Sequence, residues 1–163
     1  MKLLFICTHN RCRSILAEAI ARDVITKEHS DWQVRSAGSQ PAGVVYPGTI
    51  NFLQQQGIST EGLQSQSWDE FEEYFTDSES GPVIAITVCD SAAGESCPVW
   101  FGRGTKAHWG LPDPSKLDDK AEQAALFEKV AATLTKRIQA LLTADVTDDA
   151  QLHQVLNDLS TIR

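Results

Sequence analysis

The sequence of 163 residues has few basic side chains, and this shortage excludes one large class of functions. It carries 14 lysine and arginine residues against 22 aspartate and glutamate residues, which gives a formal net charge of −8. Nonspecific nucleic-acid binding needs clustered positive charge to neutralise phosphates. We therefore expect no nucleic-acid partner, and we expect an anionic substrate to be attracted by a local positive pocket.

Long apolar runs are missing as well. The first apolar run covers only residues 3–7 and is followed by the polar stretch 8–11. This run is too short for the apolar region of a signal peptide or for a membrane span. Apolar residues make up 42% of the chain and charged residues 22%, a composition typical of a folded globular domain. We expect a cytoplasmic protein with no membrane partner.

Cysteine is also scarce, with four residues at positions 7, 12, 89 and 97. In a chain without an export signal, cysteines indicate reactive thiols or a metal site rather than a disulfide framework. The competing metal hypothesis is a zinc site built from the cysteines with His9 or His108. The spacings of five and eight residues do not match the short cysteine pairs of structural zinc sites, so we expect no metal.

Segments with strand and helix patterns alternate along the chain, which predicts a single α/β domain with a four-stranded parallel sheet and helices on both faces, a flavodoxin-like architecture. Residues 90–104 lack periodicity and are expected to form a long mobile segment. Residues 1–143 are expected to form the domain, and residues 144–163 an extra C-terminal helix packed on it. The predicted strands are residues 2–6, 32–36, 82–89 and 106–109, and the predicted helices start near residues 14, 47, 67 and 118.

Chemistry is concentrated in the segment 7–14, Cys-Thr-His-Asn-Arg-Cys-Arg-Ser, between the first strand and the first helix. Backbone N–H groups of such a loop, together with the helix N-terminus, form a positive nest for a tetrahedral oxyanion. Arg13 can bind two oxygens of that anion with its planar guanidinium. The same positive field is expected to lower the pKa of Cys7 and leave it a thiolate, to which Ser14 can donate a hydrogen bond. Asn10 tolerates the unusual backbone angles of a tight loop.

This segment resembles the phosphate loop of the low-molecular-weight protein tyrosine phosphatase superfamily, and is most similar to its arsenate-reductase branch. The resemblance implies that Cys7 is the nucleophile and that Arg13 binds the oxyanion. Residues 108–114, His-Trp-Gly-Leu-Pro-Asp-Pro, are similar to the acidic loop of the superfamily, which implies that Asp113 is the general acid. The alternative is that Asp113 only begins a turn. The oxyanion-binding residues implied are Thr8, His9, Asn10, Arg11, Cys12, Arg13 and Ser14.

A third segment, residues 88–98, resembles the redox segment of thioredoxin-coupled arsenate reductases. The resemblance implies that Cys89 attacks Cys7 and that Cys97 then attacks Cys89, with thioredoxin, or glutaredoxin with glutathione, as the reductant and no cofactor. Cys89 on its own would more often be a buried structural residue. Cys12 is expected to pack behind the loop or to form a protective disulfide with Cys7.

The implied activity is therefore reduction of arsenate, a phosphate-like oxyanion, to arsenite. Two alternatives stay open. One is a phosphatase that hydrolyses phosphotyrosine or aryl phosphates through a Cys7 phosphoenzyme. The other is an oxyanion- or redox-responsive binding module without turnover. Against the phosphatase, Ser115 and Lys116 follow Asp113-Pro114 where phosphatases of this fold usually have aromatic residues.

Overall fold

The computed structural model describes residues 1–77, 79, 81–95 and 104–163. A parallel sheet with the strand order β2-β1-β3-β4 forms its centre. The strands are β1 (Lys2–Ile6), β2 (Gln33–Ala37), β3 (Val83–Thr87) and β4 (Thr105–His108). The helices are α1 (Arg13–Lys27), α2 (Pro47–Gln55), α3 (Glu72–Thr76), α4 (Asp90–Ala93), α5 (Lys120–Thr143) and α6 (Asp149–Leu159), with short 3-10 helices at Trp68–Phe71 and Pro114–Lys116.

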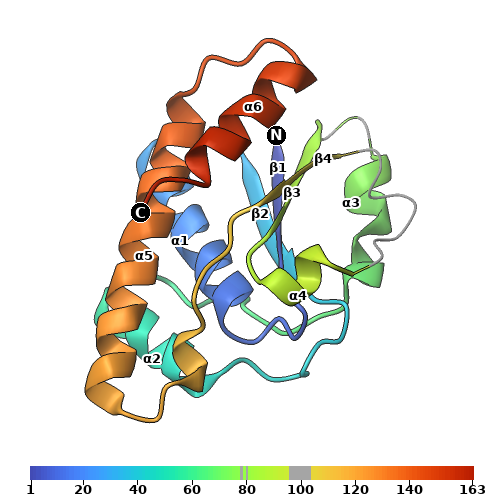
Figure 1. Cartoon of the computed structure of the whole chain (residues 1–163). Helices are drawn as coiled ribbons and strands as arrows, with labels where there is room; N and C mark the ends of the chain where they lie inside the picture. Colours follow the sequence, from blue (N-terminus) through green and yellow to red (C-terminus); the bar gives the residue numbers. More distant parts are fainter. Residues whose placement is uncertain (78, 80, 96–103) are drawn as a thin grey trace.

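Helices cover both faces of this sheet, as Figure 1 shows: α1, α5 and α6 lie on one side, and α3 and α4 on the other. Every residue of β1 is buried, and so are the first four residues of β3. Central strands covered on both faces are typical of parallel sheets, and they explain why these two segments are apolar without alternation. The predicted architecture is confirmed.

The strand register places the candidate residues at one edge of the sheet. Ile6 of β1 pairs with Ala37 of β2 and with Thr87 of β3, and Thr87 pairs with His108 of β4. The strands therefore end at nearly the same level. The loops that follow them meet at the carboxyl edge of the sheet, where ligands bind in this type of fold.

One local prediction is wrong. Residues 90–104 were expected to lack regular structure, but Asp90–Ala93 form the helix α4. The Cys89 sulfur accepts a hydrogen bond from the Ala92 amide at 3.4 Å and so caps the first turn, and Asp90 adds a negative charge there. Four residues are too few to give a periodic signal. Cys97 lies outside the described residues.

The C-terminal helix α6 packs against the rest of the domain. Its apolar residues Leu152, Leu156 and Leu159 are buried. The buried Trp109 donates its indole N–H to the Leu156 carbonyl at 3.0 Å. Arg137 of α5 donates to the carbonyls of Ser160 and Ile162, just beyond the end of α6. Among the described residues, no helix is long and apolar enough to cross a membrane.

Candidate active site

Residues 7–14, the Cys7 loop, connect β1 to α1 and turn their carbonyl groups outward. The Thr8 carbonyl accepts from the Gln40 amide at 2.9 Å, and the His9 carbonyl accepts from the Ala42 amide at 2.9 Å. The Arg11 carbonyl accepts from the Tyr46 amide at the same distance. Because these carbonyls are bonded on the outer side, the N–H groups that follow them are available to the inner side, as the His9 amide is to the Cys7 sulfur. This is the arrangement of an anion-binding nest.

Gly38 allows this outer layer of chain to approach the loop. A Cβ atom at Gly38 would lie 2.6 Å from the Thr8 carbonyl oxygen and 2.8 Å from that of Cys7. No side chain fits at such distances without displacing backbone. Gly38, at the end of the second predicted strand, therefore lets the chain pack against the Cys7 loop. The sequence pattern alone did not assign this role.

Asn10 fixes the shape of the loop from within the protein. It is fully buried and adopts a φ of 46°, as expected for a residue that tolerates the left-handed region. Its amide nitrogen donates to Ser14 Oγ at 2.8 Å and to Ser36 Oγ at 3.0 Å, and its oxygen accepts from the Gln66 amide at 2.8 Å. Ser36 in turn donates to the buried Glu18 carboxyl at 2.5 Å, and burial raises the pKa of Glu18. Glu18 therefore supports the loop from behind instead of facing solvent.

Arg13 occupies the first position of α1, beside the inner side of the loop. Its Nη1 donates to the Leu111 carbonyl at 3.2 Å, and its Nη2 lies 3.4 Å from Asp113 Oδ2. Its Nε is buried and has no hydrogen-bond partner among the described residues. A buried guanidinium N–H without a partner is costly, and an oxyanion in the loop would supply the missing acceptor.

Asp113 caps a turn and also lies beside Arg13, so its place in a turn does not exclude a role in the site. Its Oδ1 accepts from the Ser115 amide at 3.0 Å and from the Ser115 hydroxyl at 2.6 Å, which starts the 3-10 helix Pro114–Lys116. Its other oxygen faces Arg13. This carboxylate is thereby held beside the guanidinium that is expected to bind the anion.

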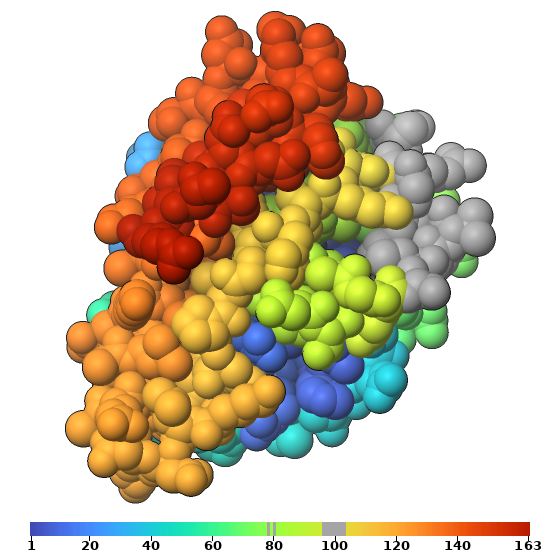
Figure 2. All heavy atoms as spheres, viewed as in Figure 1, coloured from blue at the N-terminus to red at the C-terminus, as the bar shows by residue number. Residues whose placement is uncertain are grey.

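Cys89, directly before α4, lies across the edge of the sheet from the Cys7 loop. Its sulfur accepts from the Thr8 amide at 3.4 Å and contacts the Thr8 hydroxyl at 3.8 Å. The same hydroxyl donates to Glu95 Oε1 at 2.8 Å, just past α4. In Figure 2 the blue atoms of the loop reach the surface between the yellow-green α4 and the amber acidic loop.

Cys7 and Cys89 interact so closely that each shifts the pKa of the other. Hydrogen bonding to Cys89, followed by burial, raises the pKa of Cys7, although Arg13 acts in the opposite direction. Hydrogen bonding from Cys7, aided by the amides of Ala92 and Thr8, lowers the pKa of Cys89 to about 5. The two thiols thus share one negative charge, which Arg13 favours on Cys7 and the amides of Ala92 and Thr8 favour on Cys89.

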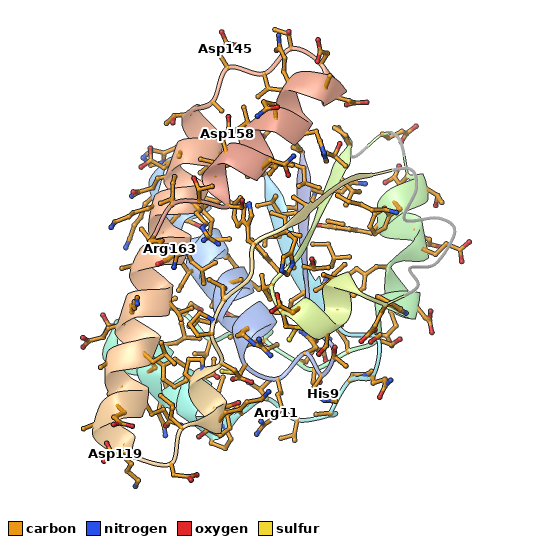
Figure 3. All side chains as sticks on the ribbon, viewed as in Figure 1. His9, Arg11, Asp119, Asp145, Asp158 and Arg163 are labelled. Atoms are coloured by element: carbon orange, nitrogen blue, oxygen red, sulfur yellow. The ribbon has the colours of Figure 1, made fainter. Side chains whose placement is uncertain are left out.

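The remaining loop residues differ in exposure. Cys12 is buried, accepts from the Thr49 hydroxyl at 3.3 Å and has a pKa raised by burial to about 11, so it packs behind the loop as a thiol. Arg11 lies over the Tyr46 ring at 4.8 Å and donates to Ser115 Oγ at 3.3 Å. Figure 3 shows His9 and Arg11 at the outer side of the loop. Ser14 accepts from Asn10, and its own hydroxyl hydrogen stays available for Cys7.

Three residues at this site escaped the sequence analysis: Thr49, Gln66 and Glu95. Each lies in a segment without a strong pattern, and each acts through a contact with a residue far away in sequence. Within the part of the chain that the structure describes, no group of three or more His, Cys, Asp or Glu residues could hold a metal ion.

Together, the parallel sheet, the inward N–H groups and the paired cysteine and arginine define a class of α/β enzymes that act on tetrahedral oxyanions. The family model of low molecular weight phosphotyrosine protein phosphatases matches residues 2–153, and the chain belongs to this family. The match extends into α6, which lies in the segment 144–163 that was expected to be an addition to the domain. The chain is thus an enzyme of the phosphatase and arsenate-reductase family.

Known relatives favour the reductase branch. An arsenate reductase of Halalkalibacterium halodurans is 30% identical over 138 residues, covering 84% of this chain and 91% of the relative. The structure of a thioredoxin-dependent arsenate reductase of Corynebacterium glutamicum is 25% identical with a TM-score of 0.59, covering 85% of this chain and 61% of that one. A low molecular weight phosphotyrosine phosphatase of Vibrio cholerae O395 shares the fold, with 21% identity and a TM-score of 0.66 over 94% of this chain and 98% of that one.

Proposed function

We propose that this enzyme reduces arsenate to arsenite, using Cys7, Cys89 and Cys97 in sequence. The observation that carries the proposal is the Cys89 sulfur, hydrogen-bonded to Cys7 and to the Thr8 amide of the Cys7 loop. A phosphatase needs one cysteine at this position. A second thiol of low pKa in contact with the first is what a disulfide-forming reductase needs.

In the first step Cys7 attacks arsenic, and a water molecule leaves. The Cys7 sulfur forms a bond to arsenic, while one As–O bond breaks. The loop N–H groups and Arg13 hold the remaining oxygens. The proton displaced from Cys7 and the proton of hydrogen arsenate together convert the departing oxygen into water, with Asp113 as the group that passes a proton to it.

In the second step the Cys89 thiolate attacks the Cys7 sulfur. An S–S bond forms, the S–As bond breaks, and its electron pair moves to arsenic. Arsenic(V) is reduced to arsenic(III), the two cysteines are oxidised to a disulfide, and arsenite leaves after taking up protons. The lowered pKa of Cys89 suits this order, since the thiol that acts second must attack as a thiolate.

Regeneration is proposed to follow through Cys97. Its thiolate attacks Cys89, which frees Cys7 and leaves a Cys89–Cys97 disulfide that an external dithiol reduces. Thioredoxin is proposed as this dithiol; support comes from the thioredoxin dependence of the Corynebacterium glutamicum relative. We also propose that the enzyme acts in the cytoplasm, where such reductants are present.

Phosphate-ester hydrolysis is the second candidate, because Cys7, Arg13 and Asp113 also meet the needs of a phosphatase. The surroundings of Asp113 weigh against it as the main activity. Ser115 follows Pro114 and binds both Asp113 and Arg11, so no aromatic side chain follows the Asp-Pro pair to stack on a phenol ring.

The test is a single turnover of fully reduced protein with arsenate and no added reductant, followed by thiol trapping and peptide mass mapping. We expect about one arsenite per chain and a Cys89–Cys97 disulfide. Absence of arsenite with all thiols intact would refute the relay. One arsenite per enzyme without further turnover when thioredoxin is added would support a responsive binding module.

A matched pair of variants separates the reductase from the phosphatase. Cys89→Ser is expected to abolish arsenite formation and to spare hydrolysis of p-nitrophenyl phosphate, because only the reductase requires the second thiol. Cys7→Ser is expected to abolish both. If Cys89→Ser still reduces arsenate, another thiol attacks the adduct and the proposed order of steps is wrong.

A further inference from the structure

A small cavity opens where α5, α6 and the acidic loop meet, apart from the Cys7 loop. Its volume is about 190 Å³. This is about the volume that six water molecules occupy in the liquid, at roughly 30 Å³ each. On one side it is lined by Leu111 and Pro112, the two residues before Asp113. In Figure 2 the last residues of the chain, in dark red, lie next to the amber segment that contains them.

The charged side chains that line this cavity are all positive: Lys129 and Arg137 from α5, and Arg163. None of the described lining residues is acidic, although the whole chain has a formal net charge of −8. Figure 3 shows Arg163 beside α5, while Asp145 lies at the opposite end of α6. Three positive charges around one small cavity repel one another unless an anion is present.

Arg137 adds a second observation, because it is 4% exposed and not fully satisfied. Its Nε and Nη2 donate to the carbonyls of Ile162 and Ser160 at 2.9–3.1 Å, and its guanidinium lies 5.8 Å from the Trp109 ring centroid. Its Nη1 is buried without a partner among the described residues. Burial, together with the charge of Arg163, lowers the pKa of Arg137. A buried N–H without an acceptor is costly, and an anion would remove that cost.

We propose that this cavity is a second oxyanion site, which binds a small dianion of the sulfate or phosphate class between Lys129, Arg137 and Arg163. Lys129 and Arg163 are exposed and can move toward the ligand, whereas Arg137 is fixed by its bonds to α6. The bound anion would lie against Leu111, whose carbonyl accepts from Arg13. The site would therefore stabilise the acidic loop and the docking of α6 at the same time. It does not depend on the proposed arsenate chemistry.

The test is a sulfate titration of the reduced, isotope-labelled protein by NMR, against sodium chloride of equal ionic strength. Two sets of amide signals report on the two sites: Gly110 and Ser160 on the cavity, and Asn10 and Ser14 on the Cys7 loop. We expect the cavity signals to shift and saturate at about 10 mM sulfate or less. If they do not saturate, or if chloride produces the same shifts, the proposal is wrong.

A double variant tests whether the cavity charges cause the shifts. The variant carries Lys129→Gln and Arg163→Gln, which replace two exposed side chains. Sulfate binding at the cavity should weaken about tenfold or more. The signals of the Cys7 loop should titrate as in the wild type. Lys120→Gln is the matched control, because Lys120 is an exposed lysine of the same helix outside the cavity, and it should change neither set. Unaltered cavity binding in the double variant would also overturn the proposal.

Discussion

Two segments leave neighbouring strands at the same edge of the sheet, and they are held in place by different means. The Cys7 loop follows β1 and is anchored by the buried Asn10 and by backbone bonds to residues 40–46. The segment 89–95 follows β3 and contains a helix of four residues. Its anchors include the buried Ala92, the contacts of Cys89 and Glu95 with Thr8, and a bond from His108 Nε2 to the exposed Asp90 carboxylate.

The difference corresponds to two tasks in the proposed reaction. A nest for a tetrahedral anion must keep its N–H groups in fixed positions before the anion arrives, because reorganisation would cost binding free energy. Cys89, by contrast, first attacks Cys7 and is then attacked by Cys97, so it must change position between the two steps. The loop with buried anchors suits the first task. The short helix with few buried anchors suits the second, since segments with few buried contacts open at low free energy.

The largest effect is expected from Arg13→Lys, which tests the rigid segment. Lysine keeps the positive charge and loses the planar pair of donors, so kcat/KM for arsenate should fall by about 10²-fold to 10³-fold. Steady-state kinetics with a thiol reductant measure this. Arg22→Lys is the control, the same substitution on the same helix at a residue that bonds Ser59. A change of less than about tenfold for Arg13→Lys would mean that charge alone holds the anion.

Asn10→Ala should have the next largest effect, this time on stability. It leaves the Gln66 amide and the hydroxyls of Ser14 and Ser36 with fewer partners and places alanine at a φ of 46°. We expect a loss of about 3 kcal/mol in the free energy of unfolding, measured by urea denaturation. Asn51→Ala, at an exposed position of α2, should cost little. Equal losses for the two variants would show that the buried network does not stabilise the loop.

These two segments also show what the sequence could reveal. Apolar runs located β1 and β3 to within two residues, because buried parallel strands carry a continuous pattern. Cys7 and Arg13 were singled out because their residue types and spacing suit oxyanion binding, and Asp113 because residues 108–114 resemble the acidic loop of the superfamily. The mutual pKa shift of Cys7 and Cys89 was missed, since it depends on a contact between residues 82 positions apart in the chain. The helix α4 was missed because its cap is a cysteine and its length is a single turn.

The contact between the two segments can be tested through the pKa of Cys89. Hydrogen bonding from Cys7 is the largest cause that lowers this pKa to about 5, so Cys7→Ala should raise it. Ultraviolet absorbance of the thiolate should be lost in the wild type as the pH falls through about 5, and at a higher pH in the variant. In Cys12→Ala the low transition should stay in place, because the Cys12 thiol ionises only near 11. If the transition stays at about 5 in Cys7→Ala, hydrogen bonding from Cys7 is not what lowers the pKa of Cys89.

The smallest effect is expected at the exposed end of α4. The Asp90 carboxylate is 96% exposed and lies 2.9 Å from His108 Nε2, and the other ring nitrogen of His108 lies 2.8 Å from Thr87 Oγ1. Asp90→Ala removes the link between α4 and β4, and Tm should change little because exposed ion pairs contribute little stability. Hydrogen exchange at the amides of α4 should become faster, since local opening needs fewer bonds to break. Asp145→Ala, in the link between α5 and α6, is the control for the loss of an exposed carboxylate. If exchange in α4 is the same in both variants, the contacts of Cys89 and Glu95 with Thr8 suffice to hold the helix, and the two segments differ less in mobility than their anchors indicate.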